Sequence, residues 1–224
     1  MTAVDAELDS WSTAAVCDAA VRSGVPCEPL PGQVLPVAAG MRTRGGLRLV
    51  RHTDSVAAVL EAIDAAVPGE VLLIDDGGRR DQACVGDLVA LEAQAAGLAG
   101  LVVWGSHRDS AELAAIGLPV FSLGPCPFAP RSAPPREPSA LPGSHGDLVL
   151  ADADGVVVLP AATRADVLRA AEQIIRTERA QAAALRRGRS LRSQLEWADF
   201  LVRRAEDPAY TFRTHLTTFG GKVE

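Results

Sequence analysis

The segment that decides the fold runs from residue 69 to residue 121 and reads GEVLLIDDGGRRDQACVGDLVALEAQAAGLAGLVVWGSHRDSAELAAIGLPVF. Short apolar runs at 70–74, 101–104 and 118–122 are typical of buried strands. Between these runs, apolar residues recur at helical spacing after Gly86 and again after Asp109. Strands that alternate with helices in this way predict an α/β fold.

The flanking segments add helices and a hairpin to this pattern. A Pro-rich connection at 124–143 contains seven Pro in twenty residues and predicts an extended surface segment. The other expected elements are an opening helix from Ser10 or Ser12 to Gly24, a helix between Val56 and Val67, a hairpin that turns at Asp152–Gly155, and two helices at Thr163–Arg187 and Ser190–Arg204.

Length and composition indicate one domain. The chain has 224 residues, of which 48% are hydrophobic, enough to bury a substantial core. We expect a single domain over 1–224, with an α/β core at 1–160. The remaining residues, 161–224, are expected to form C-terminal helices and a tail that take part in oligomer contacts.

Charge and cysteine usage exclude several function classes. The net charge of −6 argues against a nucleic-acid partner, and we interpret the basic residues between Arg186 and Arg192 as a solvated helix face. No stretch approaches eighteen uncharged apolar residues, so we expect no membrane partner and a cytoplasmic location. The four cysteines form no CxxC pair and are expected to be free thiols.

Three acids and one arginine form the candidate site. Asp87 stands at a helix start, Arg108 and Asp109 follow a strand, and Glu112 comes three residues later. On a helix, Asp109 and Glu112 would project from one face, where they could share a hard cation such as Mg²⁺ or Mn²⁺. Asp87 and Glu112 would then hold its waters, and Arg108 would face the substrate.

Backbone amides at the same helix start predict an anion site. Gly86 lets a ligand approach the backbone, and the amides of the first turn, at Asp87, Leu88 and Val89, point outward. Each feature alone also has a plain structural interpretation. The Arg–Asp dipeptide is then a surface pair, Gly86–Asp87 a helix cap and Glu112 a solvated residue.

The sequence resembles the RraA-like family, which includes 4-hydroxy-4-methyl-2-oxoglutarate aldolases. The resemblance covers residues 69–121 and three further stretches, STAAVCDA (12–19), LVLADADGVVVLP (148–160) and YTFRTHLTTFGGKVE (210–224). It implies a layered fold of the swivelling β/β/α type. It also implies a homo-oligomer, either a trimer or a hexamer built as a dimer of trimers.

The resemblance assigns roles to the candidate residues. Family aldolases have an Asp, twenty intervening residues, Arg–Asp, two residues and an acid, which matches Asp87, Arg108, Asp109 and Glu112. Asp109 would ligate the metal, and Arg108 would contact the keto and enolate oxygen of the substrate. The amides from Gly86 to Val89 would hold its carboxylate.

The implied reaction is cleavage of a 4-hydroxy-2-oxo acid to pyruvate, with oxaloacetate decarboxylation as a side activity. A Schiff-base route is not expected, because the only lysine is Lys222 in the tail. Members that resemble the regulator of RNase E lack the last acid, so Glu112 favours the enzyme over a non-catalytic protein-binding regulator. A lyase recruited to a different 2-oxo acid is a further alternative.

Three features depart from the family pattern or are not fixed by it. His107 stands where the family more often has an apolar residue, so it could tune substrate choice, act as an acid or base, or serve as a plain loop residue. The Pro-rich connection replaces a strand-like stretch. An acid from the C-terminal helices of a neighbouring subunit completes the family site, and Glu178 is our candidate for it.

Overall fold

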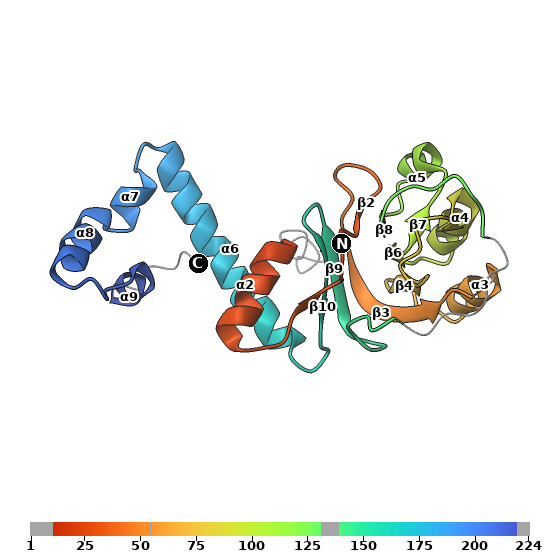
Figure 1. The fold of residues 1–224 in the computed structure, drawn as a ribbon, viewed down its shortest axis with the longest axis horizontal. Coiled ribbons are helices and arrows are strands. Elements are labelled where there is room, and N and C mark those ends of the chain that lie inside the picture. The colour runs from red at the N-terminus through yellow and green to blue at the C-terminus, as the bar shows by residue number, and fades with distance from the viewer. Residues whose placement is uncertain (1–10, 54, 131–138, 219–224) are drawn as a thin grey trace.

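The structure is a computed structural model that describes residues 11–53, 55–130 and 139–218 (Figure 1). Its main sheet has the strand order β1-β10-β9-β3-β4-β6-β8-β2, and β5 pairs separately with β7. The strands are β1 (Glu28–Pro29), β2 (Leu35–Pro36), β3 (Thr43–Arg51), β4 (Val71–Asp75), β5 (Ala83–Val85), β6 (Gly100–Trp104), β7 (Ser106–His107), β8 (Val120–Ser122), β9 (Leu148–Asp152) and β10 (Gly155–Leu159). The helices are α2 (Thr13–Ser23), α3 (Ala57–Asp64), α4 (Asp87–Ala95), α5 (Ser110–Ile116), α6 (Arg164–Arg186), α7 (Leu191–Gln194), α8 (Trp197–Glu206) and α9 (Phe212–Thr218).

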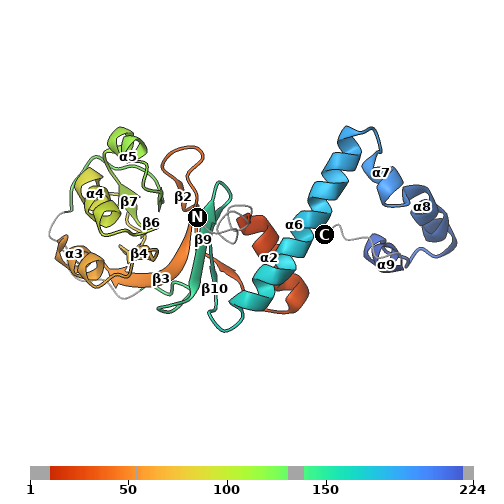
Figure 2. The same cartoon turned by 180° about the vertical axis from the view of Figure 1, so that it is seen from behind.

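Strand β3 belongs to both halves of the main sheet. Its first residues, 43–46, pair antiparallel with β9, and its last residues, 47–51, pair parallel with β4. Figures 1 and 2 show this long curved strand running from one half to the other. The antiparallel half and the parallel half therefore form one continuous curled sheet.

The parallel half is buried on both faces. Successive residues of a strand point to opposite sides. Accordingly, Leu72 and Ile74 pack with residues of α3 and α4, whereas Val71 and Leu73 pack with residues of β9 and β10. This double burial explains why the strands of this half are uninterrupted apolar runs in the sequence.

Helices α2 and α6 cover the antiparallel half. Val16, Ala19 and Ala20 of α2 pack with Leu159 of β10 and Ala171 of α6 in a hydrophobic core separate from those on the two faces of the parallel half. The second half of α6 and helices α7 to α9 extend away from the sheet as an arm (Figures 1 and 2). Across the described ranges, no helix is long and apolar enough to span a membrane.

The structure confirms the predicted α/β fold. The opening helix begins at Ser12, whose hydroxyl accepts a hydrogen bond from the Ala15 amide at 3.1 Å, and it ends at Gly24, which is left-handed with φ 63°. The hairpin of β9 and β10 turns between Asp152 and Gly155, as expected.

The C-terminal helices differ from the prediction in one place. The single helix expected over Ser190–Arg204 is two helices, α7 and α8, and Glu196 between them has a left-handed φ of 49°. This turn places Trp197 and Phe200 against Phe212 of α9, with ring centroids 5.4 and 5.0 Å from it. Lys222 and the centre of the Pro-rich connection lie outside the described residues.

Substitution of Gly45 tests the curled strand. A Cβ atom at this position would lie 2.2 Å from the carbonyl oxygen of Gly69, so Gly45→Ala forces β3 away from the segment before β4. We expect the free energy of unfolding to fall by about 1–3 kcal/mol, as for other overpacked sites. Gly46→Ala is the control, because its nearest contact would be an ordinary 3.8 Å. Equal unfolding free energies for the two variants in urea titrations would contradict this account.

Candidate active site

Pairing of β5 with β7 brings the candidate residues together. The two short strands are parallel, with Ala83 opposite Ser106 and Val85 opposite His107. The amide of Arg108 extends the pairing, because it donates a hydrogen bond to the Val85 carbonyl at 2.9 Å. The residues that follow the two strands, Gly86 on one and Arg108 on the other, are therefore neighbours in space.

Gly86 leaves the space that the arginine and the acid occupy. A Cβ atom on Gly86 would lie 2.4 Å from Oδ2 of Asp109 and 3.2 Å from both Cγ and Nε of Arg108. Any side chain here would displace the Arg108–Asp109 pair. Because Gly86 is also the N-cap of α4, both charged groups lie against the positive end of that helix.

Asp109 has an unusual backbone conformation. It precedes α5 with φ 59° and ψ 44°, in the left-handed region that residues other than glycine rarely adopt. Such strain is concentrated at functional sites. The Asp109 carboxylate accepts a hydrogen bond from Arg108 Nε at 3.1 Å, and the two side chains are 33% and 41% exposed. A pair this exposed adds little stability, so both groups remain available to a ligand.

A cavity of about 360 Å³ is lined by Arg108 of this pair, but not by Asp109. Asp87 lies at its wall, and its carboxylate accepts a hydrogen bond from the Leu88 amide at 2.7 Å. The carboxylate thus already occupies an anion position at the start of α4. The cavity is lined by residues 83–89, Arg108, Ser55, Val56, Ala129 and Pro130.

Asp109, Glu112 and Glu178 do not line this cavity. Glu112 is exposed in the first turn of α5, close in sequence to Asp109. Glu178 is exposed on α6, in the arm that extends from the sheet (Figure 1). A role for Glu178 in this site would therefore need a second copy of the chain.

His107 is buried and lines a different cavity. Its Nδ1 lies 2.6 Å from the Ser122 hydroxyl and its Nε2 lies 2.9 Å from the Ser110 hydroxyl. The cavity has a volume of about 250 Å³, and Arg80 also lines it. Burial lowers the pKa of His107, and the nearby Asp109 carboxylate opposes this only in part. The imidazole is therefore held neutral between two hydroxyls.

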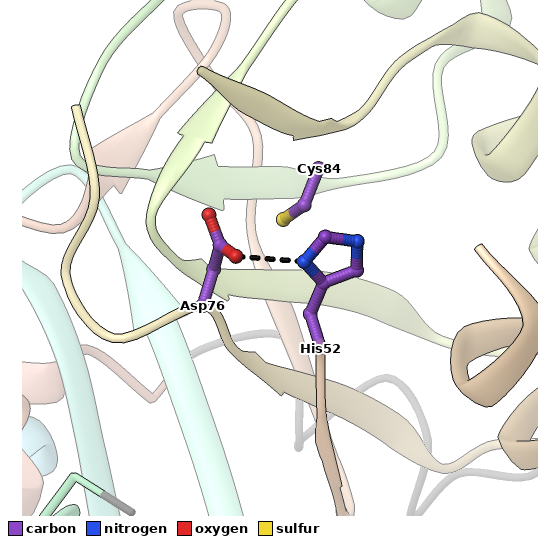
Figure 3. A group of neighbouring side chains, drawn as sticks. All are labelled: His52, Asp76 and Cys84. Atoms are coloured by element: carbon purple, nitrogen blue, oxygen red, sulfur yellow. Dashed lines mark hydrogen bonds and ion pairs between the residues drawn. The ribbon is translucent and has the colours of Figure 1, made fainter. Parts of the chain in front are cut away.

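A buried group beside the 360 Å³ cavity was not predicted from the sequence. One potential ligand atom from each of His52, Asp76 and Cys84 lies within 4.8 Å of the others (Figure 3). His52 follows β3, Asp76 follows β4 and Cys84 belongs to β5, which lines the 360 Å³ cavity. The positions of His52 and Asp76 at the ends of adjacent parallel strands were the signal that could have revealed the group.

Arg79 already balances the charge of this buried group. Its guanidinium contacts Asp76 Oδ1 and lies 3.1 Å from Nδ1 of His52, which in turn lies 2.7 Å from Asp76 Oδ1. Burial raises the pKa of the Cys84 thiol well above its usual range, and the Asp76 carboxylate raises it further. The thiol is therefore protonated, and a cation would compete with the Arg79 guanidinium.

Asp109 fits a hard cation better than the buried group does. Mg²⁺ and Mn²⁺ prefer oxygen ligands and keep several waters, which suits the Asp109 carboxylate because it is one-third exposed. Thiol and imidazole ligands suit zinc instead. Among the residues described, no second group of three potential ligands converges to 4.8 Å.

A family model described as RraA-like, Aldolase/RraA, matches residues 13–158. The chain belongs to the RraA-like family. A protein of Halalkalibacterium halodurans named "Putative 4-hydroxy-4-methyl-2-oxoglutarate aldolase" is 36% identical over 122 residues. This match covers 52% of the chain and 58% of the relative, so it spans less than two thirds of that protein.

Solved structures agree with the family assignment. An uncharacterized protein from Pseudomonas syringae pv. tomato superposes with a TM-score of 0.69 at 27% identity, over 84% of this chain and 95% of that one. The RNA-processing inhibitor RraA from Thermus thermophilis has a TM-score of 0.56 at 27% identity, over 65% of this chain and 92% of that one. The predicted layered fold of the RraA-like type is therefore confirmed.

The buried imidazole of His107 predicts a loss of stability in acid. Its pKa is lowered in the folded protein, so the unfolded chain takes up the proton first as the pH falls through the ordinary value of 6.5. We expect the wild type to lose unfolding free energy between about pH 7.5 and pH 5 relative to His107→Gln, which does not titrate there. Parallel pH profiles for the two proteins in urea titrations would refute this effect.

Proposed function

We propose that the chain is a divalent-metal-dependent aldolase that cleaves 4-hydroxy-4-methyl-2-oxoglutarate, or a related 4-hydroxy-2-oxo acid, to pyruvate and a second carbonyl product. Oxaloacetate decarboxylation accompanies this activity, because both reactions pass through pyruvate enolate. The observation that carries the proposal is the contact of Arg108 and Asp109 with Gly86 at the start of α4, beside a cavity of about 360 Å³. The name of the curated relative supports the same reaction class.

The start of α4 and Arg108 together match the two ends of a 2-oxo acid head group. The substrate carboxylate would bind the outward amides of Asp87, Leu88 and Val89, and would replace the Asp87 carboxylate that now accepts from Leu88. The Arg108 guanidinium would donate to the 2-oxo oxygen, where negative charge develops as the bond between C3 and C4 breaks. Asp87, at the cavity wall, would then be free to hold the proton that leaves the 4-hydroxyl.

Asp109 would hold Mg²⁺ or Mn²⁺, with Glu112 and Asp87 contributing through water. When bound, such a cation supplies Lewis-acid polarisation of the 2-oxo group. Arg108 keeps the Asp109 carboxylate oriented through the hydrogen bond from Nε, and Gly86 keeps the space beside it open. Both residues therefore position the carboxylate ligand as well as the substrate.

Removal of the metal or of its ligand should abolish pyruvate release. We expect EDTA and Asp109→Ala each to reduce the rate by about 10³-fold or more, because the main stabilisation of the developing oxyanion is lost. The assay couples pyruvate to lactate dehydrogenase with either substrate. Glu92→Ala removes an exposed acid from α4 and should retain full activity. Undiminished activity of Asp109→Ala would rule out the assigned site.

A regulator of RNA processing is the second candidate function, and the likeness to the Thermus thermophilis inhibitor favours it. A regulator would release no pyruvate from any 2-oxo acid with Mg²⁺ or Mn²⁺, and it would inhibit a ribonuclease in the absence of metal. Turnover of a different 2-oxo acid alone would instead support a recruited lyase. A substrate panel with and without EDTA therefore separates the three functions.

We propose that the active unit is a homo-oligomer, a trimer or a hexamer, in which Glu178 of one subunit completes the site of the next. Arg108→Ala and Glu178→Gln should then each be inactive alone. An equal mixture of the two variants, assembled at random, should recover about a quarter of the wild-type activity, because one subunit pair in four combines both intact residues.

The control mixes Arg108→Ala with Asp109→Ala. One subunit supplies both of these residues to a given site, so every site in the mixture lacks one of them. This mixture should recover no activity at any ratio. Full activity of Glu178→Gln by itself would remove Glu178 from the site and leave the rest of the aldolase proposal intact.

A further inference from the structure

Two cysteines meet at the junction of α2 and β1. Sγ of Cys17, in α2, lies 3.9 Å from Sγ of Cys27, which directly precedes β1. Both side chains are partly exposed, whereas Cys84 and Cys126 are buried. We propose that Cys17 and Cys27 form a thiol–disulfide exchange site whose oxidised state is an intramolecular disulfide. This site is independent of the aldolase proposal.

The sulfur atoms of Cys17 and Cys27 are already in contact. The two sulfurs share a hydrogen bond, so a disulfide needs them to approach by about 2 Å, toward the usual bond length. The hydrogen bond with Cys27 lowers the pKa of Cys17 to about 7, although burial and the Asp18 and Asp152 carboxylates oppose this change. The same hydrogen bond and burial raise the pKa of Cys27. Cys17 is thus the attacking thiolate and Cys27 the resolving thiol.

The exchange balances with a small-molecule disulfide such as oxidised glutathione. The Cys17 thiolate attacks one sulfur of the oxidant, the bond between its two sulfurs breaks, and one glutathione thiolate leaves. Cys27 then loses its proton and attacks the Cys17 sulfur of the mixed disulfide, which releases the second glutathione. Two protein thiols are oxidised and one external disulfide is reduced.

The bond would tie α2 to the edge of the sheet. Both cysteines pack against the core that joins α2, α6 and β10, and β1 contributes only two residues to its pairing with β10. A covalent link at this point removes freedom from the unfolded chain and holds the short edge strand in place. The oxidised protein should therefore be more stable than the reduced one.

The test incubates the folded full-length protein in glutathione redox buffers and maps the products by mass spectrometry. We expect a 17–27 disulfide that dithiothreitol reverses, with Cys84 and Cys126 still reduced. Oxidation should raise the Tm by roughly 5 °C. Cys27→Ser should instead accumulate glutathione on Cys17 and show no rise in Tm.

Cys126→Ser, which removes a buried thiol elsewhere, should behave as the wild type. Glutathione on Cys17 of the wild type without a 17–27 bond would overturn the proposal. So would a 17–27 bond that forms only after the protein is denatured.

Discussion

The hydrogen bond from the Arg108 amide to the Val85 carbonyl, at 2.9 Å, ends the pairing of β5 with β7 and sets the position of the candidate site. It brings Arg108 and Asp109 to Gly86, where the absence of a side chain leaves room for both. The start of α4 then lies beside a guanidinium and a carboxylate. The proposed anion position, cation ligand and oxyanion-stabilising group therefore all depend on one short strand pair.

The Arg79–Asp76 and Arg108–Asp109 pairs differ in how accessible their charged groups are to a ligand. Asp76 is buried, and the guanidinium of Arg79 balances its charge beside His52. Asp109 is one-third exposed, and its partner Arg108 reaches the wall of the cavity. A buried pair resists replacement by a cation, because removal of either partner leaves an uncompensated charge. The partly exposed Arg108–Asp109 pair can exchange its partners for ligands with little loss of stability.

Much of the fold could be predicted because its signals are local. The apolar runs of β4 and β6 and the Ser12 and Gly24 caps of α2 depend on a few neighbouring residues. Strands β5 and β7 have only three and two residues, and their sequences carry no signal that the two strands pair. The spacing of Asp87, Arg108–Asp109 and Glu112 predicted that these residues share one site. The contact of Arg108 and Asp109 with Gly86, however, depends on the pairing of β5 with β7, which was not predicted. The break at Glu196 depends on aromatic packing with α9, which local sequence does not encode.

A crystal structure with Mn²⁺ and oxalate, a planar mimic of pyruvate enolate, tests the central claim most directly. We predict an anomalous peak about 2.1 Å from an Asp109 carboxylate oxygen, a distance typical of small divalent ions. Oxalate should bind between that ion, Arg108 and the amides of α4. Mn²⁺ at His52, Asp76 and Cys84, or oxalate bound away from the start of α4, would contradict the account.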